Sequence, residues 1–257
     1  MKNLILFFLI VGCAHSPKPE TSPKRIVLIQ GVHLDELSWG PVKSRLETHG
    51  YEIQTLNRLG RDRAPSASLR DIARQSCEAV PKRSTVVAHS FGGAIVNAMV
   101  GICPEKIARI IYVSALVPIS GEKPFLQMSN HDQMEYGKAV DFKMGQIKPK
   151  NPYQFFKVTD PTYRYHKRTA PPLYGESMNL SMEAVEYDEK VLKEIPRSYI
   201  YTLKDNVISL KTQEFYTSRS QITQTAGVQT GHFPMISNPE ALTMEILNFA
   251  KKTEDAD

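Results

Sequence analysis

From residue 25 onward, short apolar runs alternate with longer segments whose apolar positions recur at helical spacing. The runs that predict strands are residues 25–30, 51–56, 85–89, 107–114, 199–203 and 221–225. The segments that predict helices are residues 41–49, 69–80, 92–102 and 239–250. Strands separated by helices require right-handed crossovers, which place the strands parallel in one sheet. The pattern therefore predicts an α/β fold with a mostly parallel sheet flanked by helices.

The alternation stops between about residues 118 and 196, after the fourth predicted strand. This segment is rich in aromatic and methionine residues, which are Phe125, Met128, Met134, Tyr136, Phe142, Phe155, Phe156, Tyr163, Tyr165 and Tyr174. An insertion at this point predicts a cap of short helices over the carboxyl edge of the sheet. Some of these side chains could line an apolar pocket, while most are expected to hold the cap together. The lysines and arginines of the cap predict a solvated face, with contact to anionic lipid as the alternative.

Residues 1–12 have the pattern of an export signal. Lys2 precedes the unbroken apolar run 4–11, which is too short to span a bilayer. The run ends in Gly12-Cys13, which resembles the lipobox of bacterial lipoproteins, where cleavage leaves the cysteine as an acylated first residue. Several acyl chains on one residue anchor a protein firmly to a membrane. The alternative is an ordinary secretory signal followed by a chance cysteine.

Residues 13–24 contain three prolines and few apolar residues, which predicts a disordered tether. The folded domain is then expected to extend over residues 25–257. Together with an acylated Cys13, the tether predicts a lipid-anchored protein of a bacterial cell envelope. Ala14 follows the cysteine in place of an aspartate, and by resemblance to lipoprotein sorting this favours the outer membrane.

Length, charge and cysteine content narrow the classes of function. A chain of 257 residues with 41% hydrophobic content suits one large domain. The formal net charge of +5 comes from basic residues spread along the chain, which argues against a nucleic-acid partner. Cys77 and Cys103 could pair in an oxidising compartment, and a disulfide and two separate thiols are both open. The sequence does not indicate an oligomeric state.

Three polar residues each follow a predicted strand, in the order Ser90, Asp205 and His232. The carboxyl ends of parallel strands meet at one edge, where α/β folds place their chemistry, so these side chains are expected to lie together. Ser90 lies in the sequence AHSFGG, which is similar to the G-x-S-x-G turn between a strand and a helix, with alanine for the first glycine. This order of serine, acid and histidine predicts a catalytic triad.

Each member of the triad also has a plainer interpretation. A serine followed by glycine after a strand often only caps a helix. Asp205 precedes an asparagine, a combination typical of turns. If Asp205 is not the acid, Glu214 and Asp188 are the alternatives. His33 and His89 are expected to flank the site, whereas His49, His131 and His166 fall in helix or cap segments.

These residues give the chain, from about residue 25 to its end, a resemblance to the α/β-hydrolase superfamily. Within it, the chain is similar to small carboxylesterases related to plant methylesterases and hydroxynitrile lyases. The resemblance is carried by QGV at 30–32 with Trp39, LGRD at 59–62, AHSFGG at 88–93, TLKD at 202–205 and GHFP at 231–234. It implies an oxyanion hole made by the backbone N–H groups of Val32 and Phe91. Such families usually have histidine where this chain has Gln30, a change that leaves the backbone donors in place.

The resemblance implies a serine hydrolase, and in the first place a carboxylesterase for small to medium apolar esters. Ser90 would attack the ester carbonyl, His232 would accept its proton and Asp205 would orient the histidine. This chemistry needs a small-molecule ester as partner and no metal or organic cofactor. Hydroxynitrile lyases and C–C hydrolases share the triad, but lyases of this branch carry lysine where this chain has Phe233. A non-catalytic envelope binding protein on a hydrolase fold is the third alternative.

Overall fold

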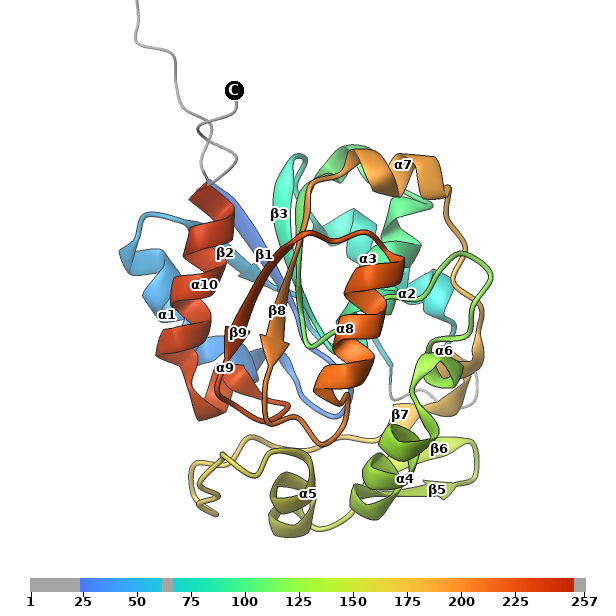
Figure 1. Ribbon diagram of the computed structural model, residues 1–257, viewed down its shortest axis with the longest axis vertical. Coiled ribbons are helices and arrows are strands. Elements are labelled where there is room, and N and C mark those ends of the chain that lie inside the picture. Colours follow the sequence, from blue (N-terminus) through green and yellow to red (C-terminus); the bar gives the residue numbers. More distant parts are fainter. Residues whose placement is uncertain (1–23, 62–66, 252–257) are drawn as a thin grey trace, which may run out of the picture.

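Six parallel strands form the central sheet, in the order β2-β1-β3-β4-β8-β9 (Figure 1). The computed structural model describes residues 24–61 and 67–251, so the predicted signal peptide, Cys13 and the tether up to residue 23 lie outside the described residues. The strands are β1 (Arg25–Ile29), β2 (Glu52–Thr55), β3 (Ser84–His89), β4 (Ile107–Val113), β8 (Arg197–Thr202) and β9 (Gln224–Val228). The predicted α/β class with a mostly parallel sheet is confirmed.

Helices cover both faces of this sheet (Figure 1). One face carries α1 (Gly40–Thr48) and α10 (Pro239–Lys251), and the other carries α2 (Leu69–Ala79), α3 (Gly92–Val100) and α8 (Leu210–Arg219). Strands buried on both faces need continuous apolar runs, which is why β1, β3 and β4 are rich in Ile and Val. Short helical elements are η1 (Glu36–Trp39), η2 (Pro104–Lys106), α7 (Glu189–Glu194) and α9 (Pro234–Ser237). No helix within the described ranges is long and apolar enough to cross a membrane.

Most of the segment between β4 and β8 forms a cap at the carboxyl edge of the strands, at the bottom of Figure 1, whereas its last helix, α7, lies at the opposite end of the molecule. Its helical elements are η3 (Pro124–Gln127), α4 (Asn130–Ala139), α5 (Pro152–Thr159) and α6 (Met178–Met182). The cap also contains an antiparallel sheet of β5 (Val140–Lys143), β6 (Gln146–Pro149) and β7 (Glu176–Ser177). The predicted short helices are therefore present, and the antiparallel sheet beside them was not predicted. Met144 and Gly145 both have positive φ, at 51° and 73°, which suits the tight turn that pairs Lys143 with Gln146.

The last strand begins three residues later than predicted, at Gln224 instead of Gln221. Gln221 has φ of 55°, and the N–H of Ile222 donates to the carbonyl of Thr217. These two residues therefore complete the turn that ends α8, a helix that the sequence pattern did not reveal. Ile222 is apolar because its side chain is buried, although it lies outside the strand.

A disulfide joins Cys77 in α2 to Cys103, which follows α3, with the two Cα atoms 6.0 Å apart. This observation decides between the two alternatives left open by the sequence. The two helices pack side by side on one face of the sheet, so the disulfide links two neighbouring helices.

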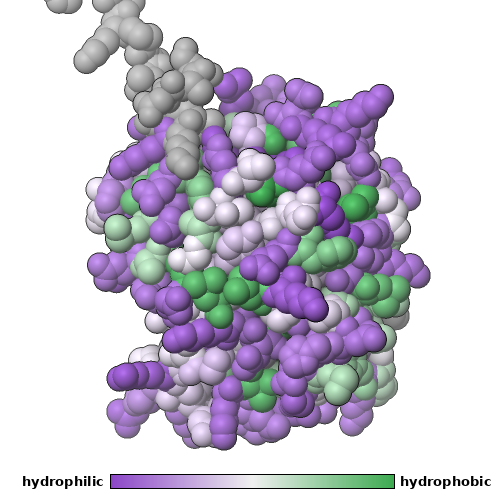
Figure 2. All heavy atoms as spheres, viewed as in Figure 1, coloured by the Kyte–Doolittle hydropathy of each residue, from purple (hydrophilic) through white to green (hydrophobic). Residues whose placement is uncertain are grey.

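The surface seen in Figure 2 is mostly hydrophilic. Exposed basic residues of the cap include Lys143, Lys157 and Arg168.

Candidate active site

Ser90 occupies a sharp turn between β3 and α3. Its φ is 54°, in the left-handed region that L-residues rarely adopt, which is the strained geometry of a nucleophile elbow. A Cβ on Gly92 would lie 3.0 Å from the carbonyl oxygen of Ile29, and one on Gly93 would lie 2.2 Å from that of Leu116. Both glycines are therefore required for α3 to start so close to the sheet. The turn holds Ser90 at the carboxyl edge, only 4% exposed.

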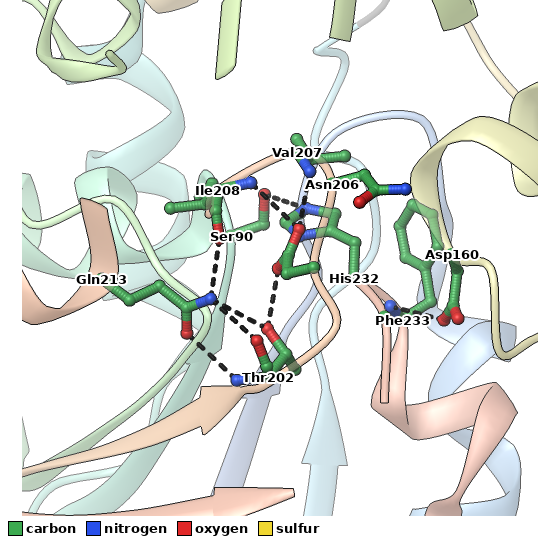
Figure 3. A network of polar contacts seen from close by, with 12 residues as sticks. Ser90, Asp160, Thr202, Asn206, Val207, Ile208, Gln213, His232 and Phe233 are labelled. Carbon is green, nitrogen blue, oxygen red and sulfur yellow. Dashed lines mark hydrogen bonds and ion pairs between the residues drawn. The ribbon is translucent and has the colours of Figure 1, made fainter. Parts of the chain in front are cut away.

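His232 lies between Ser90 and Asp205, and Figure 3 shows it beside Ser90. Its Nε2 is 2.9 Å from Oγ of Ser90, and its Nδ1 is 2.8 Å from Oδ2 of Asp205. The serine follows β3, the aspartate follows β8 and the histidine follows β9, so three strand ends bring the side chains together. The structure thus joins the three residues selected from the sequence in one chain of hydrogen bonds.

The carboxylate of Asp205 lies in a hydrogen-bond network that we call the acid network. Its members are Asp205, Thr202, Gln213 and the N–H groups of Val207 and Ile208 (Figure 3). The two N–H groups donate to Oδ1 at 2.7 and 2.9 Å, and the Thr202 hydroxyl donates to Oδ2 at 2.7 Å. Gln213 in turn donates to the carbonyls of Thr202 and Ile208. Hydrogen bonds from N–H and O–H groups favour the charged form of a carboxylate, so no cation is needed beside it.

Asp160, at the end of α5 in the cap, holds the loop that carries His232. Its Oδ2 accepts the N–H of Phe233 at 3.0 Å (Figure 3). Its Oδ1 accepts the N–H groups of Thr162 and Tyr163. A Cβ on Gly231 would lie 2.4 Å from Oδ1 of Asp160, so this close approach requires glycine. The sequence analysis missed Asp160, because an aspartate before proline reads as a turn and nothing local connects it with a histidine 72 positions away.

His89 supports both sides of Ser90. Its Nδ1 accepts the N–H of Gly31 at 3.3 Å, so the ring proton is on Nε2, which donates to the carbonyl of His232 at 2.7 Å. Burial, and secondly the charge of His232, holds the pKa of His89 well below its ordinary value of 6.5. His89 is therefore a neutral side chain that connects the loop of Gly31 with the loop of His232. The prediction that it flanks the site is correct.

His33 lies in the loop after β1, two residues after Gly31. Its Nδ1 donates to the carbonyl of Tyr174 at 2.8 Å, which leaves Nε2 to accept the hydroxyl proton of Tyr136. Burial lowers the pKa of His33 to about 4, although nearby Glu176 acts in the opposite direction. The imidazole is therefore neutral at neutral pH and connects the loop to the cap.

The backbone N–H groups of Val32 and Phe91 are free to bind a ligand. Neither donates to another group within the described residues. Both residues line a small cavity beside Ser90, with a free volume of about 30 Å³. The other residues of this cavity are largely apolar and are Leu116, Phe125, Met128, Tyr136, Ile147, Ser181, Val207 and Ile208.

The aromatic and methionine residues of the cap divide between the cavity and the cap's own packing. Phe125, Met128 and Tyr136 line the cavity. Phe155 and Phe156 instead pack against the ring of Phe233, with ring centroids 5.7 Å apart in both pairs. Others are on the surface, since Met134 is 69% and Phe142 is 47% exposed. As expected, only some of these side chains reach the site.

The alternative acids do not reach His232. Glu214 is exposed on α8, and Asp188 caps the start of α7 by accepting the N–H of Lys190. The histidines at 49, 131 and 166 are exposed and belong to helix or cap segments, as expected. Within residues 24–61 and 67–251, no cluster of His, Cys, Asp and Glu could hold a metal ion.

Comparison with known proteins matches the chain to a family of hydrolases. The profile described as "Alpha/beta hydrolase family" matches residues 26–245. Methylesterase 17 of Arabidopsis thaliana is 26% identical over 254 residues, which is 88% of this chain and 91% of the relative. The pyrethroid hydrolase of Sphingobium faniae JZ-2 superposes with a TM-score of 0.78 at 18% identity, covering 91% of this chain and 100% of the other. Polyneuridine aldehyde esterase superposes with a TM-score of 0.72 at 18% identity, over 88% of this chain and 99% of the other.

Proposed function

The chain belongs to the alpha/beta hydrolase family, and on this premise we propose that it is a serine hydrolase that cleaves small to medium apolar carboxylic esters. The observation that carries this proposal is the hydrogen-bond chain from Ser90 through His232 to Asp205, next to two unengaged backbone N–H groups. Nucleophile, base, orienting acid and oxyanion donors are the parts that acyl transfer requires. The family includes methylesterases of the kind that this chain matches.

In the proposed reaction, Oγ of Ser90 attacks the ester carbonyl while Nε2 of His232 takes the hydroxyl proton. Asp205 accepts a hydrogen bond from the Nδ1–H group, which fixes the tautomer of His232 and stabilises the imidazolium. His232 then gives its proton to the departing alcohol. A water molecule, activated by the same nitrogen, releases the acid from Ser90 in the second half of the reaction.

The N–H groups of Val32 and Phe91 are the proposed donors to the oxyanion. They line the same cavity as Ser90, and as backbone groups they need no reorganisation when charge develops on the substrate oxygen. Because these donors belong to the main chain, Gln30 in place of the family's usual histidine does not remove them.

The shape of the site supports apolar substrates. The cavity beside Ser90 is small and its lining is largely apolar, which suits a short acyl group. A larger ester has to displace cap side chains such as Phe125 and Met128. The position that carries lysine in hydroxynitrile lyases is Phe233, which packs against the cap aromatics, so the lysine of those enzymes is missing here.

A fluorophosphonate label and a panel of p-nitrophenyl acetate, butyrate and octanoate test this function. The wild type is expected to be labelled at Ser90 and to hydrolyse the acetate and butyrate faster than the octanoate. Ser90→Ala is expected to fold, to escape labelling and to lose about 10⁶-fold in kcat. A wild type that is neither labelled nor active would point to the non-catalytic binding protein.

We also propose that the protein is exported and lipid-anchored at Cys13 in a bacterial envelope. The lipobox-like ending of the apolar run supports this, and so does the disulfide between Cys77 and Cys103, because such bonds persist in oxidising compartments. Full-length protein in a bacterial host should fractionate with membranes and incorporate labelled palmitate, and deletion of residues 1–24 should release active protein. Wild type and Cys13→Ser that are both soluble would favour an ordinary secretory signal.

A further inference from the structure

The loop of residues 30–34 lies directly against Ser90 and presents one of the two proposed oxyanion donors. A Cβ on Gly31 would lie 2.6 Å from Cβ and 3.1 Å from Oγ of Ser90. No side chain fits between this loop and the serine, so a small rotation of the Gly31–Val32 peptide would move the Val32 N–H away from the reacting carbonyl. The direction of this peptide therefore has to be fixed by groups behind the loop.

Arg61 is the group behind the loop. It is 1% exposed, and its guanidinium donates to the carbonyls of Gln30 at 3.3 Å, Gly31 at 3.0 Å and Leu34 at 3.5 Å. In a trans peptide the C=O and the following N–H point in opposite directions. Because the Gly31 carbonyl points at Arg61, the Val32 N–H points away from it, toward the cavity that Val32 and Ser90 share.

A cap carboxylate fixes the other side of the loop. Oε1 of Glu176 accepts the N–H of His33 at 3.0 Å and a guanidinium proton of Arg58 at 2.8 Å, and it lies 3.7 Å from the guanidinium of Arg61. The main-chain carbonyl of Arg61 accepts the N–H of Ser177, the residue after Glu176. We call Arg58, Arg61 and Glu176, together with residues 30–34, the loop network.

We propose that Arg61 is a positioning residue of the oxyanion hole, which aims the Val32 N–H at the developing oxyanion by holding the carbonyls of Gln30 and Gly31. The inference rests on the proposed hydrolase function. The role requires arginine, because a planar guanidinium offers two parallel donors for successive carbonyls, whereas the single ammonium of lysine cannot span both in a fixed direction. Arg61 does not touch the substrate, so it acts on the transition state only through Val32.

The test compares Arg61→Lys and Arg61→Met with Arg109→Met. Arg109 is a second buried arginine, in β4, and it donates to Ser198 in the sheet and to no part of the loop. Each variant is assayed for kcat and KM on p-nitrophenyl butyrate and for inhibition by a trifluoromethyl ketone, whose adduct with Ser90 carries an oxyanion. Urea unfolding measures the stability of each variant, because removal of either buried arginine is expected to lower it.

Both Arg61 variants are expected to lose about tenfold to a hundredfold in kcat, with KM within about twofold, since one oxyanion donor is worth about 10²–10³ in kcat. The inhibition constant of the ketone should rise by the same factor. Arg109→Met should change neither quantity. Full activity in both Arg61 variants, or equal losses in Arg109→Met, would overturn the assignment.

Two further outcomes are distinguishable. If wild type hydrolyses no ester and Ser90 takes no fluorophosphonate label, the proposed function fails and the inference fails with it. If neither Arg61 variant folds, a crystal structure of wild type with the ketone bound decides. An oxyanion bonded to the N–H groups of Val32 and Phe91, with Arg61 still on the two carbonyls, supports the role, and an oxyanion that does not contact Val32 overturns it.

Discussion

Ser90 lies between two hydrogen-bond networks that are built differently. The acid network contains one formal charge, on Asp205, and joins residues close in sequence, such as Thr202 and Gln213, which are 11 positions apart. The loop network contains three charged side chains and joins distant segments, since His33 and Glu176 are 143 positions apart. The acid network belongs to the strand ends of the sheet, whereas the loop network connects the sheet to the cap.

The two networks therefore have different roles beside Ser90. The acid side handles a proton, so the charge on its carboxylate has to be available, and neutral N–H and O–H donors hold it without neutralising it. The loop side moves no proton and only has to keep a peptide in one direction. Buried ionic groups give that fixed geometry, although the loss of one partner leaves an uncompensated charge.

The largest effect is expected at His232, which serves both halves of the proposed reaction. His232→Gln removes the base, so kcat should fall about 10⁶-fold and fluorophosphonate should no longer label Ser90. His131→Gln, at an exposed position in α4, is the matched control and should keep full activity. Labelling of Ser90 at an undiminished rate in His232→Gln would place the base elsewhere.

The next effect concerns the acid network. Asp205→Asn keeps the shape of the side chain but no longer accepts the Nδ1 proton, so His232 loses its required tautomer and kcat should fall about 10⁴-fold. Glu214→Gln tests the alternative acid, and because Glu214 is exposed on α8 its loss should leave turnover unchanged. Equal losses in the two variants, measured on p-nitrophenyl butyrate, would contradict the assignment of Asp205.

In the loop network the expected effect is on stability. Glu176→Gln removes the carboxylate charge that lies 2.8 Å from the guanidinium of Arg58 and 3.7 Å from that of Arg61, which should lower the free energy of unfolding by about 3–5 kcal/mol in a urea titration. The control is Glu52→Gln, which breaks the exposed ion pair with Arg25 and should cost less than about 1 kcal/mol. Similar losses in both variants would mean that the buried ions do not connect cap and sheet as described.

The same contrast explains what could be predicted from the sequence. Ser90, Asp205 and His232 each come within a few residues of the end of a strand, so the strand ends brought them together. The cap lacks such a rule, because its short β5 to β7 strands follow from a tight turn at Met144 and Gly145 and not from an alternating pattern. For the same reason Asp160 and Glu176 were missed, since their partners are set by how the cap packs on the sheet. Arg61 was noticed only as part of a resemblance, and its contacts became visible with the loop folded above it.

The smallest expected effect is the pH dependence that His33 contributes to stability. The folded protein holds the pKa of His33 at about 4, whereas the unfolded chain has the ordinary value of 6.5. Between these values the unfolded chain binds more protons, so the free energy of unfolding falls as the pH is lowered from 6.5 toward 4, by up to about 1.4 kcal/mol per pH unit from this residue. Burial lowers the pKa of His89 in the same sense and adds to the slope.

His33→Asn isolates the share of His33. The asparagine amide can replace Nδ1 as donor to Tyr174, and asparagine tolerates the positive φ of 69° at this position. Urea titrations between pH 4 and 7 should show a shallower loss of stability in this variant than in wild type. His49→Asn, at an exposed position after α1, should keep the wild-type slope. An unchanged slope in His33→Asn would mean that burial of His33 does not contribute to the pH dependence of stability.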